Sequence, residues 1–238
     1  MFKRKKKKSE VVEPRNVIVA NKPHATASEQ FRTIRTNIMY AGVDDPIRSV
    51  LFTSAISGAG KSTIAANMAI AYAQAGIKTL LLDGDLRRPT SHYTFEVSNR
   101  VGLSSAMVND IPLENLIRKT EFDTLDLITS GPIPPNPSEL LSSKKMAQFM
   151  NSLNESYEMV IMDSPPILSV TDPQLLCKQA DGVVLVTDVE NNNRDQLVEA
   201  KDLLDKAGAN IIGVVLNHRE LKHGAEEQYY YTEAVAES

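Results

Sequence analysis

The sequence has almost no cysteine and no long apolar run, and each absence excludes a class of protein. The single cysteine, Cys177, cannot form a disulfide within the chain, which suits a reducing compartment and excludes an iron–sulfur cluster built from this chain alone. We expect Cys177 to be a small buried hydrophobic residue. No apolar run approaches the roughly 18 to 20 residues that span a bilayer, and no apolar segment follows the charged N-terminus. We therefore expect a chain that is neither secreted nor transmembrane by itself.

Acidic residues are missing from the first eight positions, where Lys3 to Lys8 are six consecutive basic residues. The net charge of −4 thus combines a basic tail with an acidic body, which holds 20 basic and 30 acidic residues. Such a basic block is usually disordered and is able to contact anionic lipid or an acidic partner. A solvated tail without a partner is the nearly equal alternative. Because no basic patch or aromatic stacking set accompanies the tail, we expect no nucleic acid binding.

Apolar runs typical of strands alternate with segments typical of helices, and 238 residues suffice for one α/β domain with a large core. The expected strands are 49–54, 78–83, 125–129, 157–163, 182–187 and 210–217. The expected helices start at Thr26 and cover 61–75, 103–107, 113–118, 137–156, a segment from Asp172, and 193–207. Residues 9–25 show no periodic pattern and indicate a linker. This alternation predicts a doubly wound, mostly parallel sheet with helices on both faces.

The segment 55–63 follows the first apolar run and opens a long helix, in the order strand, glycine-rich loop, helix. It matches the phosphate-binding pattern G-x-x-x-x-G-K-[ST] except at Ala55, which stands at the position of the first glycine. The predicted nucleotide contacts are Ser57, Gly58, Ala59, Gly60, Lys61, Ser62 and Thr63. Lys61 is expected to reach the β- and γ-phosphates, and the Ser62 hydroxyl to bind Mg²⁺. A simple glycine turn before a helix is the alternative.

Polar side chains also end three other expected strands. Asp83 and Asp85 follow one strand and Asp163 ends another, so these carboxylates are expected at the sheet edge where α/β proteins bind ligands. For the aspartate pair, a mere turn is the alternative. Asn217 ends the last strand, where its amide could contact an adenine edge, and a turn-forming asparagine is the equal alternative.

The helix expected from Thr26 carries charges on one side and apolar residues on the other. Thr26 and Glu29 form a capping-box pattern. Glu29, Arg32 and Arg35 stand three apart and so line one side of the helix, away from an apolar stripe of Phe31, Ile34, Ile38 and Met39. Spacing alone favours a capping glutamate with two solvated arginines.

The C-terminal segment 225–238 is acidic and lacks apolar periodicity, so we expect it to be disordered. It nevertheless holds Tyr229, Tyr230 and Tyr231, three of the seven tyrosines in the chain. A disordered tail has no core in which to bury three aromatic residues, which favours a chemical use for them.

With these motifs together, the chain resembles the bacterial tyrosine kinases of capsule and exopolysaccharide systems over nearly its whole length. It looks like the type in which a cytoplasmic kinase is a separate polypeptide from its transmembrane activator, built on the P-loop fold shared with ParA/MinD ATPases. The resemblance implies Lys61 and Ser62 as Walker A residues, Asp83 and Asp85 as Walker A′ acids, Asp163 as the Walker B acid, Glu29, Arg32 and Arg35 as subunit contacts, and Tyr229 to Tyr231 as autophosphorylation sites.

The function implied is an ATP-dependent protein-tyrosine kinase that phosphorylates its own tyrosine cluster and regulates polysaccharide synthesis and export. Mg²⁺ would be held by Ser62, Asp85 and Asp163, and Asp83 would orient the tyrosine hydroxyl and accept its proton. Implied partners are protein tyrosine substrates, a transmembrane activator of the polysaccharide co-polymerase type, and copies of the chain in a ring, with an octamer expected. The implied location is cytoplasmic, at the inner face of the membrane. The implied division is a basic segment 1–25, a kinase domain 26–224 and a tail 225–238.

A competing hypothesis is a ParA/MinD-like ATPase switch that binds a partner and has no kinase activity. In those relatives a second lysine enters the loop where this chain has Ile56, which argues against that subgroup. The kinase loop often carries proline and glutamate where Ser57 and Ala59 stand, so loop rigidity is expected to differ without loss of phosphate contacts.

Overall fold

Seven strands form one sheet in the computed structural model, which describes residues 16–42, 45–191 and 194–218. They are β1 (Ser49–Ser54), β2 (Thr79–Asp83), β3 (Arg118–Lys119), β4 (Leu125–Ile128), β5 (Met159–Asp163), β6 (Gly182–Asp188) and β7 (Ile211–Asn217). Their order is β3-β4-β2-β5-β1-β6-β7, and every neighbouring pair is parallel except β3 with β4. The predicted doubly wound, mostly parallel sheet is confirmed.

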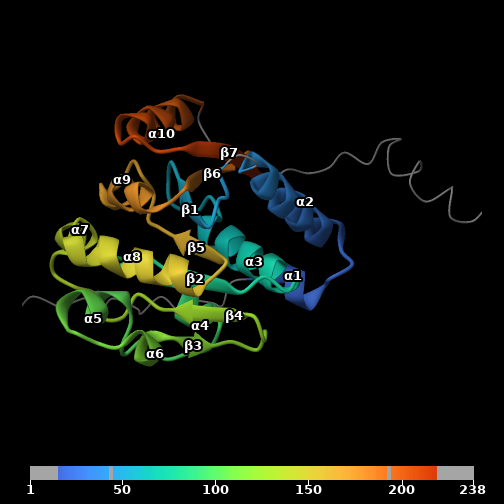
Figure 1. Cartoon of the computed structure of the whole chain (residues 1–238). Coiled ribbons are helices and arrows are strands. Elements are labelled where there is room, and N and C mark those ends of the chain that lie inside the picture. Colours follow the sequence, from blue (N-terminus) through green and yellow to red (C-terminus); the bar gives the residue numbers. More distant parts are fainter. Residues whose placement is uncertain (1–15, 43–44, 192–193, 219–238) are drawn as a thin grey trace, which may run out of the picture.

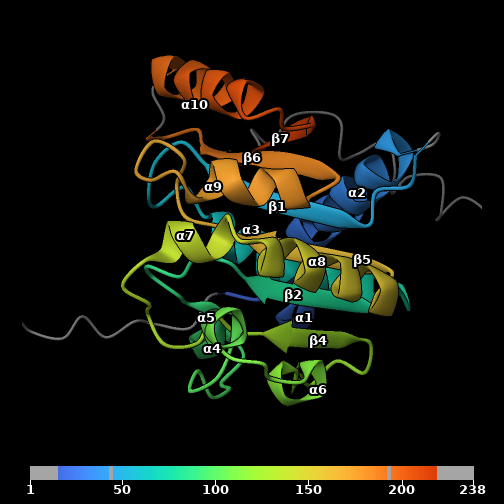
Figure 2. The ribbon, with the colours of Figure 1, turned by 60° about the vertical axis from the view of Figure 1, so that its left-hand side comes forward.

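Helices cover both faces of this sheet (Figures 1 and 2). They are α1 (Ile18–Asn21), α2 (Thr26–Ala41), α3 (Lys61–Ala73), α4 (Ser91–Thr94), α5 (Leu103–Val108), α6 (Leu113–Leu116), α7 (Pro137–Leu141), α8 (Lys144–Ser156), α9 (Asp172–Leu176) and α10 (Arg194–Lys206), with a 3₁₀ turn at Cys177–Gln179. One apolar core joins the sheet to α1, α2 and α3, and the other joins it to α5, α7, α8, α9 and α10. The functional residues at the strand ends are therefore held by a sheet that is packed on both sides.

The four central strands, β2, β5, β1 and β6, are buried at every residue. A parallel strand covered on both faces needs apolar residues on both, which explains why these segments are continuous apolar runs in the sequence. At the carboxyl edge of the sheet, β2 ends in Asp83 and β5 ends in Asp163. Cys177 is 3% exposed, which confirms its expected burial in the core.

A short helix, α1, lies within the segment expected to be a linker, so that expectation is wrong for Ile18–Asn21. Val19 is fully buried, and its backbone N–H donates to the side chain of Asn67 on α3 at 3.0 Å. The sequence did not indicate this because one buried residue and one distant asparagine produce no periodic pattern.

Helix α2 confirms the expected element, but its start and part of its apolar stripe differ from prediction. The prediction of a capping box at Thr26 and Glu29 is wrong, because Ala25 is the N-cap residue and Thr26 is already helical. The Glu29 carboxylate instead contacts Arg32 one turn later. Phe31 and Ile38 are buried as expected, whereas Met39 is 55% exposed and does not belong to the stripe.

The helix expected over 137–156 is broken into α7 and α8. Ser143 causes the break, since its hydroxyl accepts the N–H of Met146 and so caps a new helix. Asn136 precedes α7 as expected, but its side chain contacts Glu139 rather than a backbone N–H. The segment expected as a helix over 113–118 ends at Leu116 and gives way to β3.

Within the described ranges, none of the helices has both the length and the apolar character needed to cross a bilayer. The basic run at Lys3–Lys8 and the tyrosines at 229–231 lie outside the described residues. The division of the chain at residues 25 and 224 therefore stays a prediction.

Candidate active site

The glycine-rich loop joins β1 to α3 and has the conformation that phosphate binding requires. Gly58 and Gly60 have φ angles of +90° and +88°, in the left-handed region that favours glycine. A Cβ at Gly60 would also lie 2.2 Å from the side-chain nitrogen of Asn217. Ala55 has no positive φ and is buried in the core, which explains why alanine is tolerated at the first glycine position.

Helix α3 begins directly after this loop, at Lys61, and no side chain caps its first turn. The N–H groups of that turn therefore remain available to an anion, and the helix dipole adds partial positive charge there. The segment after β5 contacts the start of the loop, where Ile167 N donates to Ser54 O at 2.8 Å and Leu168 N donates to Ala55 O at 3.2 Å. These features give the loop the local geometry of a phosphate cradle.

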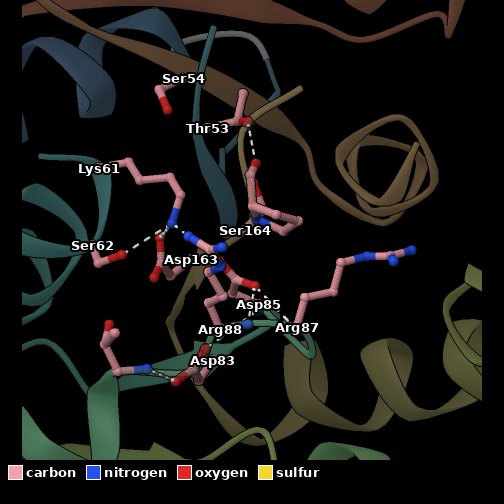
Figure 3. A network of polar contacts seen from close by, with 12 residues as sticks. Thr53, Ser54, Lys61, Ser62, Asp83, Asp85, Arg87, Arg88, Asp163 and Ser164 are labelled. Carbon is pink, nitrogen blue, oxygen red and sulfur yellow. Dashed lines mark hydrogen bonds and ion pairs between the residues drawn. The ribbon is translucent and has the colours of Figure 1, made fainter. Parts of the chain in front are cut away.

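Lys61 lies between two of the predicted carboxylates (Figure 3). Its ammonium is 3.4 Å from Asp85 Oδ2, 3.4 Å from Asp163 Oδ1 and 3.0 Å from the Ser62 hydroxyl. Burial lowers the pKa of Lys61, but the negative charges of Asp163, Asp85 and Asp83 outweigh it and raise the pKa overall. The structure therefore brings the predicted lysine, hydroxyl and acids together from three separate parts of the chain.

Asp83 is placed differently from its two acidic neighbours. It is fully buried, and its carboxylate accepts backbone N–H groups of Asp85, Thr90 and Ser91 at 3.0 to 3.3 Å. Burial, followed by the charge of Asp163, raises the pKa of Asp83 to about 7. Asp83 thus lies beneath the turn that carries Asp85 and does not line the cavity above it.

Asp163 ends β5 directly beside Asp83, with which it pairs across the sheet. Burial raises its pKa, while the Lys61 charge opposes the shift. One of its oxygens, Oδ2, is buried and has no hydrogen-bond partner in the described part of the chain. A buried carboxylate oxygen without a donor is a site where a hard cation would be stabilised.

The predicted Mg²⁺ ligands fit such a cation. Oxygen atoms of carboxylates and hydroxyls are what Mg²⁺ prefers, and Ser62, Asp85 and Asp163 all lie around the Lys61 ammonium. No group of three or more His, Cys, Asp or Glu residues in the described ranges is arranged to hold a metal by itself. A Mg²⁺ site here is therefore incomplete without the serine and the phosphate oxygens of a nucleotide, as is usual for this ion.

A cavity of about 740 Å³ opens above these residues. The glycine-rich loop forms one wall, through Ser57, Gly58, Gly60, Lys61, Ser62 and Thr63. The turn after β2 forms another, through Asp85, Arg87, Arg88, Pro89 and Thr90, and the far end is lined by His92, Tyr93, Asn99 and residues 131–133. Four residues predicted for this site do not line the cavity: Ala59, Asp83, Asp163 and Asn217. Its size suits a nucleotide.

Asn217 at the end of β7 contacts the loop rather than open space. Its amide donates to the carbonyl of Ala59 at 3.1 Å. This contact holds the loop against the sheet edge, a role that neither sequence alternative anticipated. The contact to an adenine edge stays a prediction.

An ion pair beside the cavity, between Arg87 and the buried Asp172, was not predicted. Asp172, the fully buried first residue of α9, accepts two hydrogen bonds from the Arg87 guanidinium, at 2.7 and 2.9 Å. Ser138 on α7 donates to the same carboxylate at 2.8 Å. Helix-start patterns drew attention to Ser138 and Asp172, but no local pattern indicates that both meet an arginine 51 and 85 residues away.

The charged side of α2 is remote from this cavity. Arg32 contacts Glu29 and donates to the carbonyl of Pro23 at 2.9 Å, and Arg35 donates to the carbonyl of Ala71 at 2.5 Å. None of these residues lines the cavity. Their role as subunit contacts stays a prediction.

Comparison with known proteins gives concordant results. Residues 48–207 match a family model described as an AAA domain. The chain is 46% identical over 218 residues to the tyrosine-protein kinase YwqD of Bacillus subtilis, covering 92% of each. It resembles the crystal structure of the chimerical protein CapA2B2 with a TM-score of 0.83 and 47% identity, over 89% of this chain and 94% of that chain. The kinase domain of the Escherichia coli tyrosine kinase ETK gives a TM-score of 0.83 at 31% identity, over 93% and 86% of the two chains.

Proposed function

The chain belongs to the bacterial tyrosine kinases of capsule and exopolysaccharide systems and is a nucleotide-binding tyrosine-protein kinase, and we propose that its cavity transfers the γ-phosphoryl group of Mg²⁺-ATP to tyrosine. The proposal rests mainly on the position of Lys61 between Asp85 and Asp163. Lys61 directly follows a loop that has the geometry of a phosphate cradle. The family assignment favours this function over the competing ATPase switch.

The chain's own groups would act mainly by positioning and by neutralising charge. The backbone N–H groups of the loop and of the first turn of α3 would hold the phosphates in line, with Lys61 bound to the β- and γ-phosphates. The transition state of phosphoryl transfer is loose, so charge stabilisation contributes more than nucleophile activation. The ammonium of Lys61 already faces carboxylates that would otherwise repel the nucleotide.

Ser62, Asp85 and Asp163 would hold Mg²⁺ together with phosphate oxygens. When bound, the ion supplies further neutralisation of the charge on the transferred phosphoryl group. The partnerless oxygen of Asp163 supports this assignment.

Asp83 is proposed as the group that accepts the tyrosine proton. A carboxyl with its pKa raised to about 7 holds a proton better than an ordinary aspartate, although it remains a weaker base than a phenolate. The proton would therefore move late, after the phenolic oxygen has bonded to phosphorus. Because Asp83 is buried, this role requires that the turn from Asp85 to Ser91 uncovers its carboxylate when substrates bind.

The acceptors we propose are Tyr229, Tyr230 and Tyr231 of a neighbouring copy in a ring, expected to be an octamer, with Glu29, Arg32 and Arg35 in the subunit contact. Each phosphate would add about −1.5 to −2 charges beside existing acids and so repel the tail from the assembly. This release would convert a ring into separate subunits and so regulate polysaccharide synthesis and export. A transmembrane activator would hold the chain at the inner face of the membrane.

Mass spectrometry tests the proposal. The protein, alone and with the cytoplasmic segment of its activator, is incubated with Mg²⁺-ATP, and intact and peptide masses are measured. Phosphate on the 225–238 peptide that is absent from Lys61→Met supports the kinase proposal. ADP release with an unmodified tail supports the ATPase switch.

A further inference from the structure

Two consecutive arginines follow Asp85, and the structure places them in opposite ways. Arg87 and Arg88 both line the cavity. In Figure 3, the Arg87 side chain runs away from Lys61, whereas that of Arg88 extends toward the Lys61 ammonium and Asp163. The sequence alone does not distinguish the two arginines, so the different directions of their side chains arise from tertiary contacts.

Arg87 is engaged in holding the fold together. Its Nε and Nη2 atoms bind the buried carboxylate of Asp172, and Nη2 also donates to the Ser138 hydroxyl at 3.1 Å. These bonds tie the turn after β2 to α7 and α9. A guanidinium fixed in this way has few donors left for a ligand.

The Arg88 side chain, in contrast, is exposed and makes no hydrogen bond or ion pair with any described residue. Its backbone is nevertheless fixed, because the N–H groups of Arg88 and Arg87 donate to Asp85 Oδ1 at 2.9 and 3.2 Å. The other oxygen of the same carboxylate faces Lys61 at 3.4 Å. One aspartate therefore sets both the cation environment of the site and the position from which Arg88 reaches into it.

The negative charge at the site favours a further cation beside Lys61 and Mg²⁺. Asp85 and Asp163 each lie 3.4 Å from the Lys61 ammonium, and a bound triphosphate would add further negative charge. A planar guanidinium with all its donors unused suits the oxygens of a phosphoryl group, which it is able to contact through two parallel hydrogen bonds.

We propose that Arg88 is a catalytic residue that binds the γ-phosphoryl group within the same chain and stabilises the charge on it during transfer. This inference rests on the proposed function, since it requires a nucleotide whose γ-phosphate lies beside Lys61. Arg87 is a positioning residue, which acts through the turn that it anchors. In other phosphoryl-transfer enzymes, an arginine with this task accelerates the reaction by about 10³-fold or more.

Nucleotide affinity tests the proposal independently of kinase activity. The full chain and the Arg88→Gln and Arg88→Lys variants are titrated with fluorescent ADP and with a fluorescent non-hydrolysable ATP analogue, each in the presence of Mg²⁺. Arg88→Gln is expected to weaken binding of the triphosphate analogue about tenfold and that of ADP less than twofold. Arg88→Lys is expected to recover part of the loss, because a lysine keeps the charge but not the paired hydrogen bonds.

Arg48→Gln is the matched control, since it removes one exposed arginine just before β1, at the opposite end of the strand from the loop. It should change neither affinity. Equal effects of Arg88→Gln on both nucleotides, or an effect on neither, would overturn the assignment. In the phosphorylation assay, Arg88→Gln should lower the rate at least about 100-fold, and a rate within twofold of the unmodified chain would also overturn it.

The two proposals fail in different ways. A chain that binds the triphosphate analogue through Arg88 but modifies no tyrosine contradicts the proposed function and leaves Arg88 as a γ-phosphate contact. A chain that phosphorylates tyrosine at the same rate with Arg88→Gln retains the proposed function and loses the assignment of Arg88. Circular dichroism spectra of the Arg88 variants identify any loss of folding. If Arg88→Gln fails to fold, the nucleotide affinities of Arg88→Lys, which keeps the charge, are compared with those of the unmodified chain.

Discussion

Asp83 and Asp163 lie opposite each other at the ends of the neighbouring parallel strands β2 and β5. Two carboxylates in this position, both buried, would repel each other strongly if both were ionised. Burial raises the pKa of both carboxyls, and that of Asp83 reaches about 7. The Lys61 ammonium, 3.4 Å from Asp163, opposes the shift on that partner. The two carboxyls therefore differ in their contact with Lys61, which favours the charged form of Asp163.

The stability of the protein without nucleotide should depend on pH through Asp83. Because its folded-state pKa of about 7 exceeds the ordinary value of 3.8, the folded protein binds a proton that the unfolded chain has released between these values. The contribution of Asp83 to the free energy of unfolding is therefore fully present at low pH and is lost as the pH rises from about 4 to about 7. In melting experiments with EDTA from pH 5 to pH 8, Asp83→Asn should lose less stability than the unmodified chain. An identical pH dependence in both would contradict the raised pKa.

The same group should control the pH dependence of tyrosine phosphorylation. If ionised Asp83 accepts the proton, the rate rises with pH as its carboxyl ionises, and Asp83→Asn removes both the rise and most of the activity. The rate is measured with Mg²⁺-ATP at pH 5.5 to 8.5. An Asp83→Asn variant that keeps the rate and its pH profile would leave Asp83 with a structural role only.

Gly60 and Asn217 should show strong energetic coupling. Gly60→Ala combines a positive φ with a Cβ placed 2.2 Å from the Asn217 amide nitrogen, so it should destabilise the protein and weaken nucleotide binding. Gly208→Ala is the control, because Gly208 also has a positive φ but no atom within 4 Å of the added Cβ, and should cost only about 1 to 2 kcal/mol. Adding Asn217→Ala should restore part of the stability lost in Gly60→Ala. Additive effects in the double variant, measured by urea unfolding, would contradict this close packing.

Asp172 should be required for stability although it lies outside the glycine-rich loop. Asp172→Ala leaves the Arg87 guanidinium without its carboxylate, and the cost should be about 2 to 3 kcal/mol, at or below the lower end for buried pairs because the Arg87 side chain is 37% exposed. Urea unfolding measures the loss. Asp110→Ala breaks the pair between Asp110 and Lys145, in which the Asp110 side chain is fully exposed, and should leave stability unchanged. Equal results for the two variants would remove the assigned role of Asp172.

The charged side of α2 should control assembly. Arg32→Ala combined with Arg35→Ala should lower the molar mass measured by light scattering to that of a monomer, whereas Arg194→Ala on α10 should not. Because Arg35 also donates to the Ala71 carbonyl, Arg32→Ala alone is tested beside the double variant. An unchanged mass in variants that remain folded would contradict the subunit contact.

Much of this arrangement follows from local sequence. Continuous apolar runs predicted the central strands, and the strand–loop–helix order predicted the phosphate cradle. The acids at strand ends predicted that Asp85 and Asp163 meet Lys61 at one edge of the sheet. The Asp83 backbone contacts and the bonds between Arg87 and Asp172 could not be predicted, because they depend on how a turn folds back and on partners far away in the chain. Ser143 shows a third limit, since a single side-chain cap divides a helix whose apolar pattern continues across the break.

The mass of the 225–238 peptide after incubation with Mg²⁺-ATP and the activator's cytoplasmic segment tests tyrosine phosphorylation most directly. One or more added phosphates are expected on Tyr229, Tyr230 or Tyr231 in the unmodified chain, and none in Lys61→Met. Release of ADP from a chain whose tail stays unmodified would contradict it.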